Sequence, residues 1–341
     1  MLRLILSVAV LIAIVQCCEK STFTDVKIKA SKYFHTTDDP DDIKIEDPIN
    51  GCITPTEELK SALRIIINYQ SVPTLYEGAV QDLEWLHELK MENDDIEVIK
   101  PGAFKNLPTI STLSLESNKL KEIPEGVFNN MLVKRLDLSK NSISKIAPGA
   151  FDNMPNLVKI ELNNNAIKEW NSNWFTNTPN IYFLSATHNQ ITELPKDAFK
   201  NFKGKHVEPG KSILFTSIYL SNNKIENIHA KAFKNLKQLH TLDLDHNSIA
   251  NLDNNMFSEF DSIKNLLLHD NKIVCLSDGF LRKLPSTEMI TVNENPLDCD
   301  CLKKMKKWGR EHNVEMRMTI RSIECMQERI QNVLESVKDI N

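Results

Sequence analysis

The sequence predicts an α/β solenoid of about ten stacked turns, a horseshoe with a parallel sheet on its concave side and turns and short helices on its convex side. Two repeating patterns predict this fold, one of leucine with asparagine and one of phenylalanine. Both have the same period, which is mostly about 24 residues, and they stay in phase along most of the chain. Cysteines at the end of the array predict a disulfide-containing C-terminal cap.

The first pattern is a Leu-x-Leu segment, followed after two residues by asparagine and then by a further aliphatic residue. Its alternation predicts a short strand whose aliphatic side chains face inward. One repeat cannot bury its own apolar face, but stacked neighbours can, so the pattern also predicts stacking. The asparagines recur once in each repeat, with one longer step before the fifth, and they are Asn118, Asn141, Asn165, Asn189, Asn223, Asn247, Asn271 and Asn295.

Two degenerate copies extend the array toward the N-terminus. Asp94 and then Gln70 occupy the asparagine position, each one repeat before the next copy. Terminal repeats of a solenoid usually depart from the consensus, because they form caps. The array therefore contains ten turns in our count.

The second pattern is a row of phenylalanines, which we expect to stack as a spine on the side opposite the strands. Many of them follow Ala or Gly-Ala and precede Asn-Leu or Asn-Met. Strands on one side and bulkier turns on the other should produce the curvature. The leucine, asparagine and phenylalanine positions are thus structural and do not form sites. The row consists of Phe104, Phe128, Phe151, Phe175, Phe199, Phe233, Phe257 and Phe280.

The repeats resemble those of extracellular leucine-rich-repeat proteins over roughly residues 60 to 325. The order Ile-x-Pro-Gly-Ala-Phe-x-Asn-Leu-Pro at residues 99–108 is similar to the typical subtype of Toll-type receptor ectodomains and secreted insect repeat proteins. The resemblance implies that each asparagine side chain hydrogen-bonds backbone groups of adjacent turns. Aspartate and glutamine can do this only in part, which fits their place at the end of the array.

The ends of the chain suggest three further segments around the repeats at 59–297. Leu4 to Val15 is apolar and shorter than the roughly 20 residues that cross a bilayer as a helix. We therefore assign residues 1–17 to a signal peptide and expect a secreted, extracellular protein without a membrane anchor. Residues 18–58 become an N-terminal arm and cap, whose acidic stretch near Pro40 and Pro48 predicts a solvated, poorly ordered segment.

Residues 298–341 form the C-terminal cap. The stretch from Asn295 to Cys301, followed by Trp308, resembles the flanking cap of extracellular repeat proteins, but one of the cap's usual four cysteines is missing. The resemblance implies a Cys299–Cys325 bond and leaves Cys301 without its usual partner. Cys275 has the same phase as Cys299 one turn earlier, about one strand spacing away. Two pairings are therefore feasible, Cys275–Cys299 with Cys301–Cys325 or Cys275–Cys301 with Cys299–Cys325, and we prefer the second.

Two further cysteines near the N-terminus, Cys18 and Cys52, can form a disulfide. Cys18 would pair with Cys52 if the signal peptide ends at Cys17. If Cys18 is removed, an odd number of cysteines remains, and an unpaired one would permit a disulfide-linked dimer.

The last residues carry a helical apolar stripe. It consists of Ile330, Val333, Leu334, Val337 and Ile340 within residues 327–340. We expect a helix that covers the last repeat, because an exposed solenoid end needs a cap. The alternative is a short partner-binding helix.

Outward-facing strand positions carry the specificity of such a solenoid. In the first half of the array they are of mixed charge, as a solvated face is. In the second half, apolar and aromatic side chains occupy a face that should be wet, and they would anchor a partner, with two aspartates between them to bind a basic group. Scattered surface hydrophobes are the plainer explanation. The candidate ligand-binding residues are Phe183, Tyr219, Asp243, Asp245, Leu267, His269 and Met289.

The longer step between Asn189 and Asn223 contains an insertion with a basic character. Insertions in one repeat often mark the binding face, although a solvated loop explains the same composition. The basic residues are Lys200, Lys203, Lys205, His206 and Lys211.

Catalytic motifs are absent from the sequence. His87-Glu88 begins a metalloprotease-like motif, but Met91 stands where its second histidine is needed. A zinc site at Cys299, Cys301 and His312 would lack the usual spacing and a fourth ligand. We therefore expect no enzyme activity, no cofactor and no metal.

The net charge of −5 argues against a nucleic-acid partner. We expect a secreted binding protein whose concave face recognises a protein or a glycoconjugate, such as a microbial-surface ligand, and the resemblance suggests innate immunity. The alternatives are an adhesive matrix protein and a secreted decoy or effector that sequesters a signalling ligand.

Overall fold

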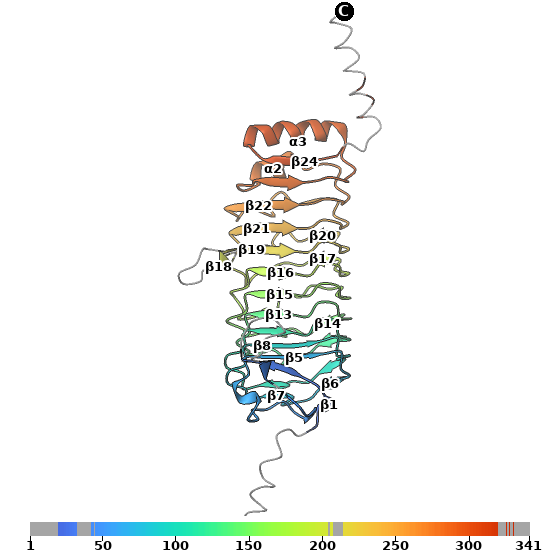
Figure 1. Cartoon of the computed structure of the whole chain (residues 1–341). Coiled ribbons are helices and arrows are strands. Elements are labelled where there is room, and N and C mark those ends of the chain that lie inside the picture. The colour runs from blue at the N-terminus through green and yellow to red at the C-terminus, as the bar shows by residue number, and fades with distance from the viewer. Residues whose placement is uncertain are drawn as a thin grey trace, which may run out of the picture. The chain divides into compact units, whose positions relative to one another are not determined.

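The computed structural model describes residues 20–32, 42–43, 45–203, 205–206 and 214–319, together with residues 325, 327 and 330. The expected signal peptide, most of the expected C-terminal helix, and Lys211 lie outside the described residues. Figure 1 shows the chain with its strands and helices labelled. The chain divides into two compact units. Unit 1 comprises Met1–Glu161 with Asn173–Thr178, and unit 2 comprises Leu162–Ser172 with Pro179–Asn341.

Unit 1 is a stack of turns that each contribute one strand to a parallel sheet. The register places equivalent leucines opposite one another, as Leu89, Leu113 and Leu136 show. These inward-facing residues are buried, which confirms the alternation predicted from the sequence. In order across the sheet the strands are β5 (Arg64–Asn68), β8 (Glu88–Glu92), β11 (Thr112–Ser114), β13 (Arg135–Asp137) and β15 (Lys159–Glu161).

The other side of unit 1 consists of turns and short two-stranded parallel ladders. Helices are few in the described residues, where the 3-10 helix η1 (Leu59–Ser61) precedes the first repeat strand. The ladders pair β6 (Thr74–Leu75) with β9 (Val98–Ile99), β7 (Val80–Gln81) with β10 (Phe104–Lys105), and β12 (Glu122–Ile123) with β14 (Lys145–Ile146).

The N-terminal end of unit 1 is covered by short antiparallel strands. β2 (Lys29–Ser31) pairs with β5, and β3 (Asp42–Ile43) pairs with β2. β1 (Phe23–Val26) pairs with β4 (Ile49–Gly51). Phe23, Val26 and Ala30 are buried, so this segment supplies apolar cover for the first turn. Asp42–Ile43 thus forms a strand inside the stretch expected to be poorly ordered, because β2 offers it a backbone edge.

Unit 2 repeats the same plan. Its sheet runs in the order β16 (Phe183–Ser185), β19 (Leu214–Tyr219), β21 (Gln238–Asp243), β22 (Ser262–Leu267), β23 (Met289–Thr291) and β24 (Glu315–Arg317), all parallel. β18 (Lys205–His206), from the insertion, pairs with β19 in antiparallel fashion. The remaining elements are β17 (Glu193–Leu194), β20 (Asn227–Ile228), α2 (Asp278–Lys283) and α3 (Cys299–His312).

The phenylalanine row forms a buried spine in each unit. In unit 1, ring centroids from Phe104 to Phe175 are 6.3, 6.1 and 5.4 Å apart along the stack. In unit 2, the centroids from Phe199 to Phe280 are 5.3, 5.8 and 5.7 Å apart. Neighbouring aromatic rings at these separations attract each other beyond simple burial. The predicted spine is confirmed within each unit.

The asparagines form a hydrogen-bonded ladder. Asn223 is typical, because its Oδ1 accepts from the backbone N–H of Ile191, 3.0 Å away on the preceding turn. Its Nδ2 donates to the carbonyl oxygens of Ala186 and Leu220, each at 3.0 Å. Asn118 makes the equivalent bonds in unit 1. One amide thus satisfies backbone groups on two turns, which the resemblance implied and the structure confirms.

The ladder weakens at Asp94, which is fully buried. Its Oδ1 accepts from the backbone N–H of Gln70 at 2.9 Å, but among the described residues its Oδ2 has no hydrogen-bond partner. Burial of the carboxylate raises the pKa of Asp94 to about 7. A carboxylate has no N–H to donate to the two carbonyl oxygens that an asparagine would reach.

Asp94→Asn should therefore raise the free energy of unfolding by about 1–3 kcal/mol above pH 7. Folding raises the pKa of this carboxyl, so the carboxyl lowers stability progressively as pH rises from its unfolded pKa near 4 to its folded pKa near 7. The advantage of asparagine should accordingly shrink toward zero at about pH 4. Urea denaturation of both proteins between pH 4 and 8 measures the difference. An advantage that does not change with pH would contradict this account of Asp94.

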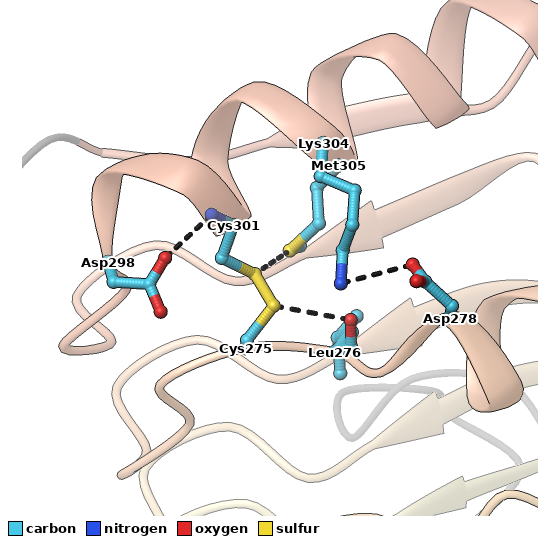
Figure 2. The surroundings of a disulfide bond; sticks show 7 residues. All are labelled: Cys275, Leu276, Asp278, Asp298, Cys301, Lys304 and Met305. Carbon is cyan, nitrogen blue, oxygen red and sulfur yellow. Dashed lines mark hydrogen bonds and ion pairs between the residues drawn. A yellow bond between two sulfur atoms is a disulfide. The ribbon is translucent and has the colours of Figure 1, made fainter.

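The C-terminal cap is joined to the last repeats by covalent and ionic links (Figure 2). Disulfides join Cys275 to Cys301 and Cys299 to Cys325, with Cα atoms 5.4 and 5.3 Å apart. This is the second of the two feasible pairings. Asp298 caps α3 by accepting from the Cys301 backbone N–H at 2.6 Å.

Two further contacts surround the Cys275–Cys301 bond. The Cys301 sulfur lies 3.3 Å from the Met305 sulfur, and Lys304 forms an ion pair of 3.2 Å with Asp278 on α2. Cys52 is also disulfide-bonded. Its expected partner Cys18 lies outside the described residues, so that pairing stays a prediction. All five described cysteines are disulfide-bonded, so none of them offers a free thiol for the disulfide-linked dimer that an unpaired cysteine would permit.

The double substitution Cys275→Ala/Cys301→Ala should lower the free energy of unfolding by about 3–4 kcal/mol, because the bond closes a loop of 26 residues in the unfolded chain. Chemical denaturation under oxidising conditions measures this loss. Lys304→Ala is the matched control, which removes only a surface ion pair and should cost less than about 1 kcal/mol. Equal stabilities of the double variant and the parent would contradict the expectation.

Candidate ligand-binding face

The outward-facing side chains of the unit 2 sheet form three rows across the strands. The register places Tyr219, Asp243 and Leu267 side by side in the middle row. Phe183 and Met289 both lie in the first row, with three strands between them. We call this surface the unit 2 face and define it by these five residues together with Asp245 and His269, which follow the strands in the third row.

An aromatic pair marks one side of the unit 2 face. The rings of Phe183 and Tyr219 have centroids 5.3 Å apart at an interplanar angle of 39°. Both side chains are half-buried, so each retains surface that a partner could cover. Large, rigid aromatic side chains of this kind contribute strongly to protein interfaces.

Two carboxylates lie beside the aromatic pair. Asp243 is 9% exposed, and its Oδ1 accepts from the Asp245 backbone N–H at 3.0 Å. Asp245 is half-buried, and its Oδ1 accepts from the His269 backbone N–H at 2.6 Å. Within the described ranges, no lysine or arginine forms an ion pair with either carboxylate. The unit 2 face therefore carries two carboxylates that no lysine or arginine of the described residues neutralises.

Burial raises the pKa of Asp245 to about 6, and the neighbouring charge of Asp243 adds to the rise, while the His269 backbone N–H opposes it. A carboxyl in this situation would be stabilised in its ionised form by a cationic ligand. The pair can therefore recognise a basic group, such as a lysine or arginine side chain.

Histidines border the carboxylates. His246 Nδ1 lies 2.8 Å from Asp270 Oδ2, and the rings of His246 and His269 are 4.8 Å apart and nearly perpendicular. His269 Nδ1 is buried without a hydrogen-bond partner among the described residues. Asp270 was not among the candidate residues, although it has the same phase as His246 one repeat later.

The corresponding face of unit 1 is different, because several of its charges are paired with one another. Arg64 lies 2.9 Å from Glu88, Lys159 lies 2.8 Å from Glu161, and Lys140 lies 2.8 Å from Glu116. A ligand there would have to displace these pairs or leave them buried, which is costly. The contrast favours the unit 2 face.

The candidate residues are brought together only in part. Tyr219, Asp243 and Leu267 are neighbours, and Phe183 contacts Tyr219, but Asp243 separates the aromatic pair from Leu267. The sequence did not indicate the strand β24, which extends the sheet and places Arg317 beyond Thr291 in the middle row. The Arg317 guanidinium forms an ion pair with Glu315, with Nε 2.7 Å from Oε1.

No group of three or more histidine, cysteine or acidic side chains in the described part of the chain has an arrangement that could hold a metal ion. Among the helices of the same residues, none combines the length and hydrophobicity required to cross a bilayer.

Comparison with known families identifies two matches. Residues 75–205 match the model of the BspA type leucine rich repeat region in six copies. Residues 215–273 and 240–297 match a second leucine rich repeat model. No curated protein matches the chain.

Solved structures show the same fold. The chain is similar to a protein in the crystal structure of the mouse RP105/MD-1 complex, with a TM-score of 0.62, 22% identity, and coverage of 74% of this chain and 42% of that one. It is also similar to a protein in the Drosophila Toll–Spatzle complex, with a TM-score of 0.61, 16% identity, and coverage of 73% and 36%. The chain thus spans less than half the length of these proteins. On the repeats, the asparagine ladder and the family matches together, the chain belongs to the leucine-rich-repeat proteins.

Proposed function

We propose that this protein is a secreted recognition protein that binds a protein partner through the unit 2 face. The proposal rests on the Asp243–Asp245 pair, which forms no ion pair with a lysine or arginine of the described residues and lies beside the Phe183–Tyr219 pair. An aromatic anchor next to a carboxylate fits a partner segment with a basic side chain, whose aliphatic stem would pack on Tyr219 or Leu267.

The comparisons support a protein as the partner. Both similar structures are complexes of leucine-rich-repeat proteins with other proteins, MD-1 in one and Spatzle in the other. The second complex is described as a molecular hub in Drosophila development and innate immunity, and we propose a role in immune recognition for this chain on that analogy. Its disulfides support an oxidising, extracellular compartment. We infer binding rather than catalysis, as is typical of leucine-rich-repeat proteins.

Phe183→Ala/Tyr219→Ala should weaken binding of the partner at least about thirtyfold, since truncating an aromatic anchor typically costs about 2 kcal/mol or more. The partner would be captured from extracellular fluid on the immobilised protein, and its affinity then titrated against each variant. Thr112→Ala/Arg135→Ala is the matched control, because these two residues are opposite each other on the unit 1 sheet.

The control should keep the parental affinity, and thermal denaturation should show that the aromatic variant is folded. Capture of the same proteins with equal affinity by the aromatic variant would overturn the unit 2 face as the site. Capture of a matrix polymer in place of a discrete protein would favour the adhesive alternative.

Binding should weaken as pH falls through about 6, because protonation of Asp245 removes one of the two negative charges that attract the basic group. Asp245→Asn should bind less tightly at pH 7.5 and lose this part of the pH dependence. Titrations of the captured partner between pH 5 and 7.5 test the point. Asp243, His246, His269 and Asp270 also surround this group, so a pH dependence that survives unchanged in the variant would assign it to them.

A further inference from the structure

The C-terminal cap carries a cluster of positively charged side chains that are not part of the unit 2 face. The 14 residues of α3 include five lysines or arginines and only two acidic residues, in a chain whose net charge is −5. Four of these basic residues recur on α3 at the spacing of one helical face, and they are Lys303, Lys306, Lys307 and Arg310. Of these, Lys303, Lys307 and Arg310 are exposed. They extend for about 10 Å along the helix axis.

Stabilisation of the helix end does not explain this charge. Basic residues interact favourably with the carbonyl end of a helix, but the effect is confined to the last turn. In α3 the basic residues of the last turn are Arg310 and His312. Lys303 and Lys306 lie before that turn.

An open groove of about 870 Å³ lies beside this helical face. Lys306 and Arg310 line it from α3, and Asn313 lines it from the turn that follows the helix. Ser286 and Thr287, just before β23, also line it. The groove therefore offers cationic side chains together with hydroxyl and amide groups, which is a surface suited to a polar ligand.

The charges of the groove favour an anion. Two carboxylates line it, but Glu288 forms an ion pair with Lys264 at 3.2 Å and Glu315 forms one with Arg317 at 2.7 Å. Lys306 and Arg310 have no ion-pair partner within the described part of the chain. The positive charges of Lys306 and Arg310 are thus available to a ligand, whereas the negative charges of Glu288 and Glu315 are already paired.

We propose that this groove and the basic face of α3 bind a sulfated oligosaccharide. Sulfate groups fit the planar donor fork of Arg310 and the point charge of Lys306, while sugar hydroxyls would hydrogen-bond Ser286, Thr287 and Asn313. The volume of the groove is that of a site for a ligand of a few rings. A membrane would meet the exposed lysines but would leave the groove empty. The site would hold the protein on sulfated glycans while the unit 2 face binds its partner.

Titration of the full chain with a heparin octasaccharide at physiological salt tests the proposal. The parent should bind, and Lys306→Glu/Arg310→Glu should weaken binding at least about tenfold. Lys231→Glu/Lys234→Glu is the matched control, because it changes the net charge equally at two exposed lysines elsewhere in unit 2. The charge-preserving variant Lys306→Arg/Arg310→Lys should retain most of the binding, which guards against a folding defect as the cause of the loss.

Three further arms decide the outcome. The desulfated octasaccharide should not bind, and Phe183→Ala/Tyr219→Ala should bind the sulfated one normally, which keeps this site separate from the proposed function. Vesicles with phosphatidylserine should bind more weakly than the octasaccharide. Equal losses in the 306/310 variant and in the control, or preference for the vesicles, would overturn the assignment of a saccharide site.

Discussion

The structure depends on one constraint, which is that backbone groups turning inward from every strand must find partners in the interior. A single asparagine per turn meets it, with its oxygen accepting from one turn and its amide donating to two carbonyl groups. An unpaired buried polar group would cost about 1–3 kcal/mol. The ladder therefore fixes the register of neighbouring turns, and the register in turn stacks the aliphatic strands and the phenylalanine spine.

Because the ladder and the spine hold the turns, the outward-facing strand positions can differ between the units. Unit 1 uses them for paired charges such as Arg64 with Glu88. Unit 2 uses them for an aromatic pair and for two carboxylates without ion pairs among the described residues. The same scaffold thus presents one face on which several charges form ion pairs and one whose two carboxylates form none among the described residues.

The ends of the array follow other rules, because an end turn has a neighbour on one side only. At the N-terminal end, antiparallel strands with buried Phe23 and Val26 cover the first turn. At the C-terminal end, α3 is tied to the last repeats through Cys275, which stands in for the cysteine that the cap lacks. One side of α3 is buried, with Leu302 and Met305, and the opposite side exposes basic residues.

The sequence by itself determined the fold class, the number of turns and the identity of the core, since a shared period in two residue types permits only stacking. It also singled out the side chains of the unit 2 face, because strand alternation tells which residues point outward. Only the tertiary structure decided which of them are neighbours, that Asp243 stands between Tyr219 and Leu267, and that Asp270 reaches His246. The same holds for β24 and the N-terminal strands, which lack the repeat and exist because a bare sheet edge accepts them. A local sequence pattern identifies the elements that repeat. The pairing of segments that do not repeat depends on which strand edges and charged side chains remain without partners in the folded chain.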